Sequence, residues 1–366
     1  MKLDRRVFLL GSAMAAQAYQ AERPIGTAMI GTGNRGSFLL QGVLQQPDAK
    51  VAAVCDIKPD RLDKAATAAA RDRPATETDW RKLIDRKDVD AVFIATPPYL
   101  HSEMAIAAIQ AGKHVYCEKP LGVTPEQIRA LLQTARGSHQ VFVAGQQLRS
   151  QKQLSDVVRK IQDGLIGDVL MVKAQRHATA DLPHDGTSGD WYFDVTKSGG
   201  YLVEQSVHNL DLCNWVIGAH PLRAAGFGAI QLYKNDPPGR TIFDCGSLTY
   251  DYPKGVKLSF TQNVFHPASM PNGGQYVYVY GSKGAIDLMA GTMYSPGSGA
   301  PPVVVSPKVQ EDQYAHIRAF YDSIAKGTPP PVDVTIGATA ALTAILGHRA
   351  MVQEKVVTWS DLGVEV

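Results

Sequence analysis

Residues 31–36 read Gly31-Thr32-Gly33-Asn34-Arg35-Gly36, and this stretch decides the fold. An apolar run over 27–30 precedes it and is typical of a buried parallel strand, while apolar residues at helical spacing follow it. Glycines at its first, third and last places allow a tight turn, a close approach of backbone amides to a pyrophosphate, and packing of the helix on the strand. The helix N-terminus then offers N–H groups to the phosphates. The stretch therefore predicts a dinucleotide-binding turn.

An acidic residue at the end of the next strand supports this interpretation. The apolar run 50–55 ends at Asp56, about 20 residues after the last glycine, where such folds place their ribose-binding carboxylate. Asp56 would accept hydrogen bonds from the ribose hydroxyls and repel a 2′-phosphate, which favours NAD. Lys58 lies close enough to keep NADP open as a second cofactor.

Two domains follow from the pattern along the chain. Over 22–146, strands and helices alternate strictly, which predicts a doubly wound Rossmann domain with the parallel strand order 3-2-1-4-5-6. From residue 147 onward, strands joined by short turns predict an α+β domain with a largely antiparallel open sheet, so the class is α/β overall. We expect strands over 169–176, 224–233, 241–252, 256–263 and 275–281, a helix over 204–216, a surface loop over 291–302, and late helices over 313–326 and 335–353 that can pack back on the first domain.

Composition excludes several classes of partner. The 366 residues are 45% hydrophobic and 20% charged with a net charge of +2, which is ordinary for a globular protein and argues against nucleic-acid binding. The four cysteines show no disulfide pattern. The histidines lack metal-ligand spacing, so we expect no metal.

The N-terminus has the order of an export signal. Asp4-Arg5-Arg6-Val7-Phe8-Leu9 resembles the twin-arginine motif, an apolar stretch follows, and Ala16-Gln17-Ala18 is a small-x-small cleavage site. We therefore expect residues 1–18 to be a signal peptide for periplasmic export by the twin-arginine pathway. No membrane anchor would remain after cleavage. The alternative is a plain N-terminal tail.

Four motifs together resemble one family of oxidoreductases. They are the turn 31–36, Thr96-Pro97-Pro98 with His101, Glu118-Lys119-Pro120, and the run 199–211. In this order and spacing they resemble the glucose-fructose oxidoreductase, inositol dehydrogenase and MocA family over nearly the whole chain. The resemblance implies that the cofactor is held by Gly31, Gly33, Asn34, Arg35, Gly36, Asp56, Thr96, Pro97, His101, Glu118 and Lys119.

The same resemblance implies a catalytic pair. Lys119 follows a parallel strand, where such folds place ligands, and the family gives this lysine a catalytic role, often before a cis proline bond. His208 is the candidate acid or base for a substrate hydroxyl. Glu204 lies four residues earlier, at helical spacing, where it could orient the imidazole ring; much of the family has aspartate there. The alternatives are that Lys119 is a solvated surface lysine and that His208 is a structural histidine with its hydrogen bonds made inside the core.

The implied activity is hydride transfer between NAD and a secondary alcohol of a sugar or cyclic polyol. An exported enzyme meets little free NAD, so we expect the cofactor to be tightly held. The alternatives are an NAD-dependent glycoside hydrolase that oxidises its substrate transiently and a non-catalytic sugar sensor. Arg149, His177 and Trp191 could form the substrate wall, although structural roles fit them equally well. We also expect a homo-oligomer formed through the C-terminal sheet.

Overall fold

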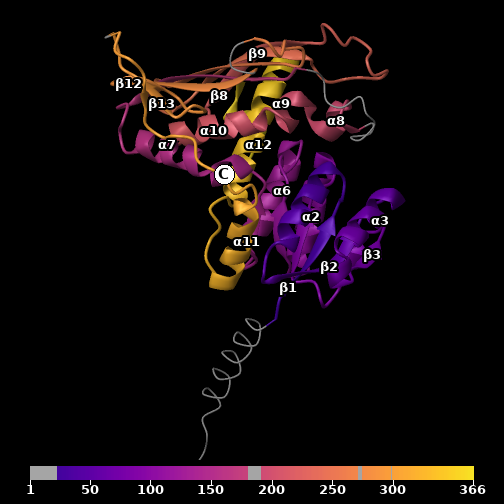
Figure 1. Cartoon of the computed structure of the whole chain (residues 1–366). Helices are drawn as coiled ribbons and strands as arrows, with labels where there is room; N and C mark the ends of the chain where they lie inside the picture. Colours follow the sequence, from indigo (N-terminus) through magenta and orange to yellow (C-terminus); the bar gives the residue numbers. More distant parts are fainter. Residues whose placement is uncertain (1–22, 180–190, 271–273, 298) are drawn as a thin grey trace, which may run out of the picture.

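The computed structural model describes residues 23–179, 191–270, 274–297 and 299–366, which form two domains (Figure 1). The expected signal peptide, 1–18, lies outside the described residues. Within the described ranges, no helix is both long enough and apolar enough to cross a bilayer.

The first domain is the predicted Rossmann fold. Its six strands lie in the order β3-β2-β1-β4-β5-β6, and every neighbouring pair is parallel. The strands are β1 Ile25–Ile30, β2 Ala49–Cys55, β3 Ala75–Glu77, β4 Ala91–Ile94, β5 His114–Cys117 and β6 Phe142–Ala144. The main helices are α2 Asn34–Leu44, α3 Pro59–Ala68, α4 Arg81–Ile84, α5 His101–Gln110 and α6 Pro125–Arg136. The predicted strand order is confirmed.

The strands of this sheet are apolar throughout because both faces are covered. Side chains such as Ile30 and Ile94 join a core that includes residues of α5 and α6. Their neighbours Met29 and Phe93 join a second core with residues of α2 on the opposite face. A sheet buried on two sides has continuous apolar runs rather than alternation. The glycine turn after β1 therefore stands on a rigid support.

In the part of the chain that the structure describes, the second domain is built on a mixed sheet of nine strands. The order is β14-β13-β12-β11-β7-β10-β9-β8-β15, in which β7 and β10 are parallel and the other neighbours are antiparallel. The strands are β7 Val169–His177, β8 Arg223–Ala229, β9 Cys245–Asp251, β10 Lys257–Asn263, β11 Gln275–Gly281, β12 Gly284–Asp287, β13 Thr292–Tyr294, β14 Val303–Val304 and β15 Val357–Thr358.

Two predictions for this sheet were wrong in detail. The strand expected over 224–233 ends at Ala229, because the N–H groups of Gln231, Leu232 and Tyr233 donate to the Asp244 carboxylate instead of a neighbouring strand. The loop expected over 291–302 contains β13, which pairs with β12. The four short strands β12 to β15 were not foreseen.

The helices of the second half join the two domains. They are α7 Lys152–Gln162, α8 Val195–Ser198, α9 Gly200–Glu204, α10 Val207–Ile217, α11 Ala315–Lys326 and α12 Val334–Gln353. Figure 1 shows α12 in yellow, running from the large sheet down toward α6 of the first domain. It contacts β8 and α10 at one end and α6 and β6 at the other. α11 packs on the Rossmann sheet, with the ring of Phe320 edge-on to Phe93 at 5.3 Å. α12 therefore links the two domains, and α11 anchors the C-terminal part of the chain on the first domain.

Candidate active site

A cleft of about 880 Å³ opens at the carboxyl ends of the Rossmann strands. One wall is the first domain, with the turn 31–35, the end of β2, the loop 95–101 and Glu118-Lys119. The other wall comes from the second domain, with Trp191, Tyr192, Lys197, Glu204, Gln205 and His208. Ligands of open α/β sheets bind at this edge.

The glycine turn has the geometry that a dinucleotide needs. Gly31 has a φ of +84°, and a Cβ there would lie 2.7 Å from the Ala95 carbonyl oxygen. At Gly36 a Cβ would lie 1.9 Å from the Gly31 carbonyl oxygen, so only glycine lets α2 pack on the turn. α2 begins without a capping side-chain hydrogen bond or an acid in its first turn. Its first amides and its dipole therefore suit phosphate groups.

Asp56 is held at the tip of β2 by backbone amides. Its carboxylate accepts hydrogen bonds from the amide of Thr32 at 2.8 Å and the amide of Lys58 at 2.9 Å. Asp56 and Lys58 both line the cleft. The carboxylate keeps lone pairs for further donors, so these residues fit the ribose end of a dinucleotide.

His101 ties two loops of the cleft together. Its ring nitrogens lie 2.7 Å from the Pro120 carbonyl oxygen and 2.8 Å from the Thr96 carbonyl oxygen. The bond between Lys119 and Pro120 is cis. Thr96, Pro97 and His101 all line the cleft, but His101 is almost fully buried, so its ring holds the loops in place.

Arg35 and Glu118 form an ion pair in the wall of the cleft. The Arg35 Nε donates to the Glu118 carboxylate at 2.7 Å, and its Nη2 donates to Gln147. The amide of Lys119 donates to the other Glu118 oxygen at 3.2 Å. The turn after β1 and the loop after β5 are therefore braced against each other just below Lys119.

Lys119 crosses the domain boundary. Its Nζ donates to the Glu204 carboxylate at 2.9 Å and to the Glu204 carbonyl oxygen at 2.6 Å. The other Glu204 carboxylate oxygen accepts a hydrogen bond from Gln205. Both charged side chains are largely buried, so the ammonium group is held in one place within the cleft.

The proposed orientation of His208 by Glu204 is not seen. The two residues belong to different helices, because α9 ends at Glu204 and α10 begins at Val207. Among the described residues, the His208 Nδ1 is buried without a hydrogen-bond partner. Burial lowers the pKa of His208 well below 6.5, and the nearby charges of Lys119, Arg176 and Arg35 lower it further. His208 is therefore a neutral imidazole in the cleft.

Comparison with known proteins places this arrangement in a family. The model for "Oxidoreductase family, NAD-binding Rossmann fold" matches residues 25–146, and that for the "GFO/IDH/MocA C-terminal domain" matches residues 155–287. Together they match most of the chain. The chain belongs to the Gfo/Idh/MocA family. Its cofactor is accordingly NAD, as the cleft geometry indicates.

Relatives of this Gfo/Idh/MocA protein have several activities. A glycosyl hydrolase family 109 protein of Saccharopolyspora erythraea is 32% identical over 191 residues, covering 50% of this chain and 42% of the relative. A myo-inositol 2-dehydrogenase of Thermotoga maritima is 22% identical over 342 residues, covering 91% of this chain and 98% of the relative. The solved structure of a levoglucosan dehydrogenase with NADH and levoglucosan shares the fold, with a TM-score of 0.78, 20% identity and coverage of 92% and 99%.

Two of the three expected substrate residues of this Gfo/Idh/MocA chain lie elsewhere. The Arg149 guanidinium donates to both carboxylate oxygens of buried Asp211, at 2.9 and 2.8 Å, and stacks over Trp215. The His177 ring contacts Thr261 and His266. Neither Arg149 nor His177 lines the cleft, whereas Trp191 does. Tyr192 and Gln205 were missed, although each stands beside a residue that the motifs singled out.

The Arg149 pair can be tested directly. Because Arg149→Met leaves the Asp211 carboxylate buried without its cation, we expect the free energy of unfolding to fall by about 3–5 kcal/mol with NAD affinity unchanged. Denaturant unfolding and calorimetry measure the two quantities. Adding Asp211→Leu should recover much of the loss. A single variant that keeps its stability but loses substrate affinity would restore Arg149 to the substrate wall.

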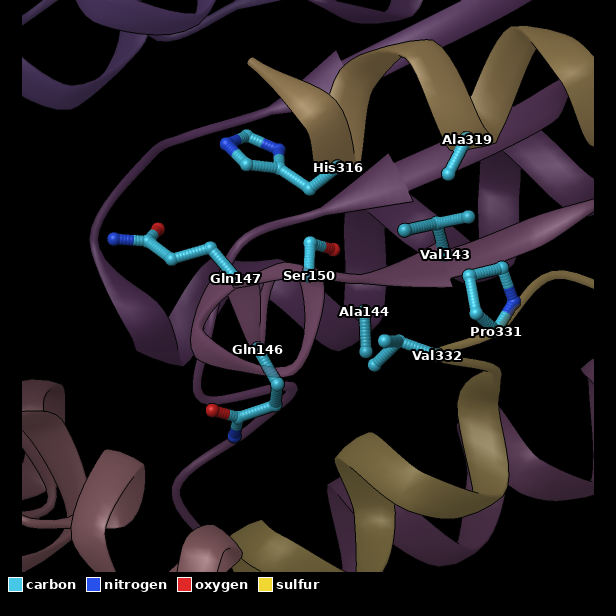
Figure 2. Close-up of a pocket in the computed structure, with 9 residues that line it drawn as sticks. All are labelled: Val143, Ala144, Gln146, Gln147, Ser150, His316, Ala319, Pro331 and Val332. Atoms are coloured by element: carbon cyan, nitrogen blue, oxygen red, sulfur yellow. The ribbon is translucent and has the colours of Figure 1, made fainter. Parts of the chain in front are cut away.

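A second, much smaller cavity shares Gln147 with the cleft. Figure 2 shows it between the residues around the end of β6 and α11, with Val143, Gln147 and His316 among its lining. Its volume of about 10 Å³ has room for a single water molecule. It is too small for a sugar, so the large cleft is where we place the chemistry.

Proposed function

We propose that the protein transfers a hydride between a secondary alcohol of a sugar or cyclic polyol and a tightly held NAD. The observation that carries this proposal is that Lys119 and His208, from different domains, both line the cleft that holds the dinucleotide turn. An alcohol oxidation must remove a proton from oxygen and a hydride from the same carbon. Lys119 can bind the reacting oxygen, and His208 can take up its proton.

The residues of the cleft would divide the work as follows. The amides of the turn 31–36 would hold the pyrophosphate, and Asp56 would hold a ribose. The nicotinamide, when bound, supplies the hydride acceptor or donor. Lys119, fixed by Glu204, can donate a hydrogen bond to the reacting oxygen and stabilise negative charge that develops on it. Neutral His208 can accept the hydroxyl proton as the carbonyl forms, and return it in the reverse direction.

A hydrolytic use of the same residues is the second candidate, and the family 109 relative favours it. A transient ketone would acidify the neighbouring C–H, and the glycosidic bond would break by elimination to leave an unsaturated ketone. Water would then add across its double bond, and return of the hydride would reduce the ketone to the free sugar. Such a cycle shows no net redox change. A non-catalytic sugar sensor fits less well, because it would need neither the held lysine nor the neutral histidine.

Product analysis separates these functions. The purified protein is incubated with NAD and a panel of sugars, inositols and glycosides, and the products are identified by mass spectrometry. A keto product with reduced cofactor supports the oxidoreductase, and a cleaved glycoside without net redox supports the hydrolase. If the protein binds members of the panel without changing any of them, the sensor replaces both.

We further propose periplasmic export through the signal in residues 1–18, supported by Arg5 and Arg6 ahead of the apolar stretch. Combining Arg5→Lys with Arg6→Lys should retain the precursor in the cytoplasm, as fractionation would show. Normal maturation of that variant would mean that the signal has been misread. Because free NAD is scarce outside the cytoplasm, the exported protein would carry its cofactor with it.

The C-terminal sheet is the surface we propose for self-association. Strand register places Met171, Phe227 and Tyr280 on one face, where they are 41%, 68% and 40% exposed. Packing against a second copy of the sheet would remove these apolar side chains from water. Sedimentation analysis should show an oligomer that Phe227→Glu weakens; a wild-type monomer contradicts the proposal.

A further inference from the structure

A tyrosine of the second domain lies near Glu204, the carboxylate that holds Lys119. Tyr192 lines the cleft from the second domain, and only 2% of its surface is exposed. Its hydroxyl has no hydrogen-bond partner among the described residues. A buried hydroxyl without a partner costs about 1–3 kcal/mol, and in the wall of a cleft a ligand can supply the missing partner.

The position of Tyr192 is well defined. Its ring packs with Phe193 and Ile242 in a small separate core. The following backbone is tied to Thr241, whose amide donates to the Phe193 carbonyl oxygen at 3.0 Å and whose hydroxyl accepts from the amide of Val195 at 2.9 Å. Tyr192 is thus held in the wall of the cleft by a braced segment.

The surroundings of the hydroxyl also exclude a role as base. Burial raises the pKa of Tyr192 well above 10, and the charge of nearby Glu204 raises it further. The phenol therefore stays neutral and can both donate and accept one hydrogen bond. A sugar or polyol hydroxyl has the same two capacities, whereas the phosphates of a dinucleotide only accept.

We propose that the Tyr192 hydroxyl binds a substrate hydroxyl next to the reacting carbon and so acts as a specificity-determining residue. This inference rests on the proposed function. The substrate would satisfy the phenol on binding, while Lys119 and His208 act on the neighbouring oxygen. A ligand lacking that hydroxyl would leave Tyr192 unpaired and bind more weakly.

The test uses Tyr192→Phe with a matched control. Within the described ranges, the Tyr250 hydroxyl is likewise buried without a partner, but Tyr250 lies in the core of the second domain and does not line the cleft. We expect Tyr192→Phe to weaken binding of the best sugar or polyol roughly five- to tenfold, the worth of one neutral hydrogen bond. Tyr250→Phe should leave that binding unchanged, and neither variant should alter NAD affinity. Calorimetry on NAD-saturated protein, with myo-inositol, levoglucosan, glucose and methyl glycosides as probes, measures these affinities.

Monodeoxy analogues of the best probe then identify the partner hydroxyl. The wild type should bind one of these analogues more weakly than it binds the full sugar. Tyr192→Phe should bind that analogue and the full sugar equally well, because the two changes remove the same hydrogen bond. Equal losses in both proteins for every analogue overturn the inference while leaving the proposed function intact. If the wild type neither binds nor converts any probe, the inference and the proposed function fail together.

Discussion

Lys119→Ala should lower turnover at least about a hundredfold while the protein still binds NAD, because Lys119 acts on the substrate oxygen rather than on the pyrophosphate. The expected cause is the loss of the ammonium group that Glu204 holds in the cleft at 2.9 Å. Steady-state rates on the best substrate and NAD calorimetry measure the two effects.

A lysine at the other end of the same strand provides the control. Lys113 precedes β5 and donates to the carbonyl oxygens of Arg86 and Val89, away from the cleft. Lys113→Ala should therefore change stability but not the chemistry of the folded enzyme.

Removing Lys119 also leaves the Glu204 carboxylate short of a partner. Lys119→Ala combined with Glu204→Gln should regain stability without regaining turnover. Near wild-type turnover in Lys119→Ala would remove the lysine from the mechanism.

His208→Asn should cost a similar factor, about a hundredfold, because a positioned base is lost. In the wild type, the acid limb of the pH profile, where kcat/KM falls as the pH is lowered, should lie well below pH 6.5. The lowered pKa keeps His208 neutral as the pH falls past the ordinary histidine value. The same shift means that the unfolded chain binds more protons below about pH 6.5, so the folded state loses stability there.

Rate profiles against pH for three proteins make this test specific. His348 is also buried, with a pKa lowered to about 4 by burial, but it does not line the cleft. His348→Asn should therefore keep the wild-type profile, whereas His208→Asn should lose both rate and acid limb. An unchanged rate in His208→Asn would make His208 a structural residue.

Local signals explain why the first domain could be predicted from the sequence. The glycine turn, the acid after β2 and the prolines after β4 are each specified by residues close together in the chain. Fully apolar strands also follow from burial on both faces. The strands β12 to β15 escaped prediction because runs of two to four residues carry no periodicity.

The errors at the site have a different origin. Arg149 and His177 were candidates for the substrate wall from their place in the chain. The sequence could not show their actual partners, because these lie 62 residues away at Asp211 and 84 residues away at Thr261. The spacing of Glu204 and His208 suggested a shared helix face, but the helix is interrupted between the end of α9 and the start of α10. The Glu204 carboxylate instead accepts a hydrogen bond from Lys119 of the other domain. A contact between domains has no local sequence pattern that could predict it.

The most direct test of the account is whether hydride moves between substrate and cofactor in this cleft. Protein saturated with NAD is mixed with carbon-deuterated sugars, inositols and glycosides, quenched within about one turnover, and its cofactor is weighed by mass spectrometry. Both the oxidoreductase and the redox-assisted hydrolase predict deuterium in the nicotinamide ring from at least one substrate, and none with Lys119→Ala. A cofactor that stays unlabelled with every member of the panel, including those that bind, would contradict the account.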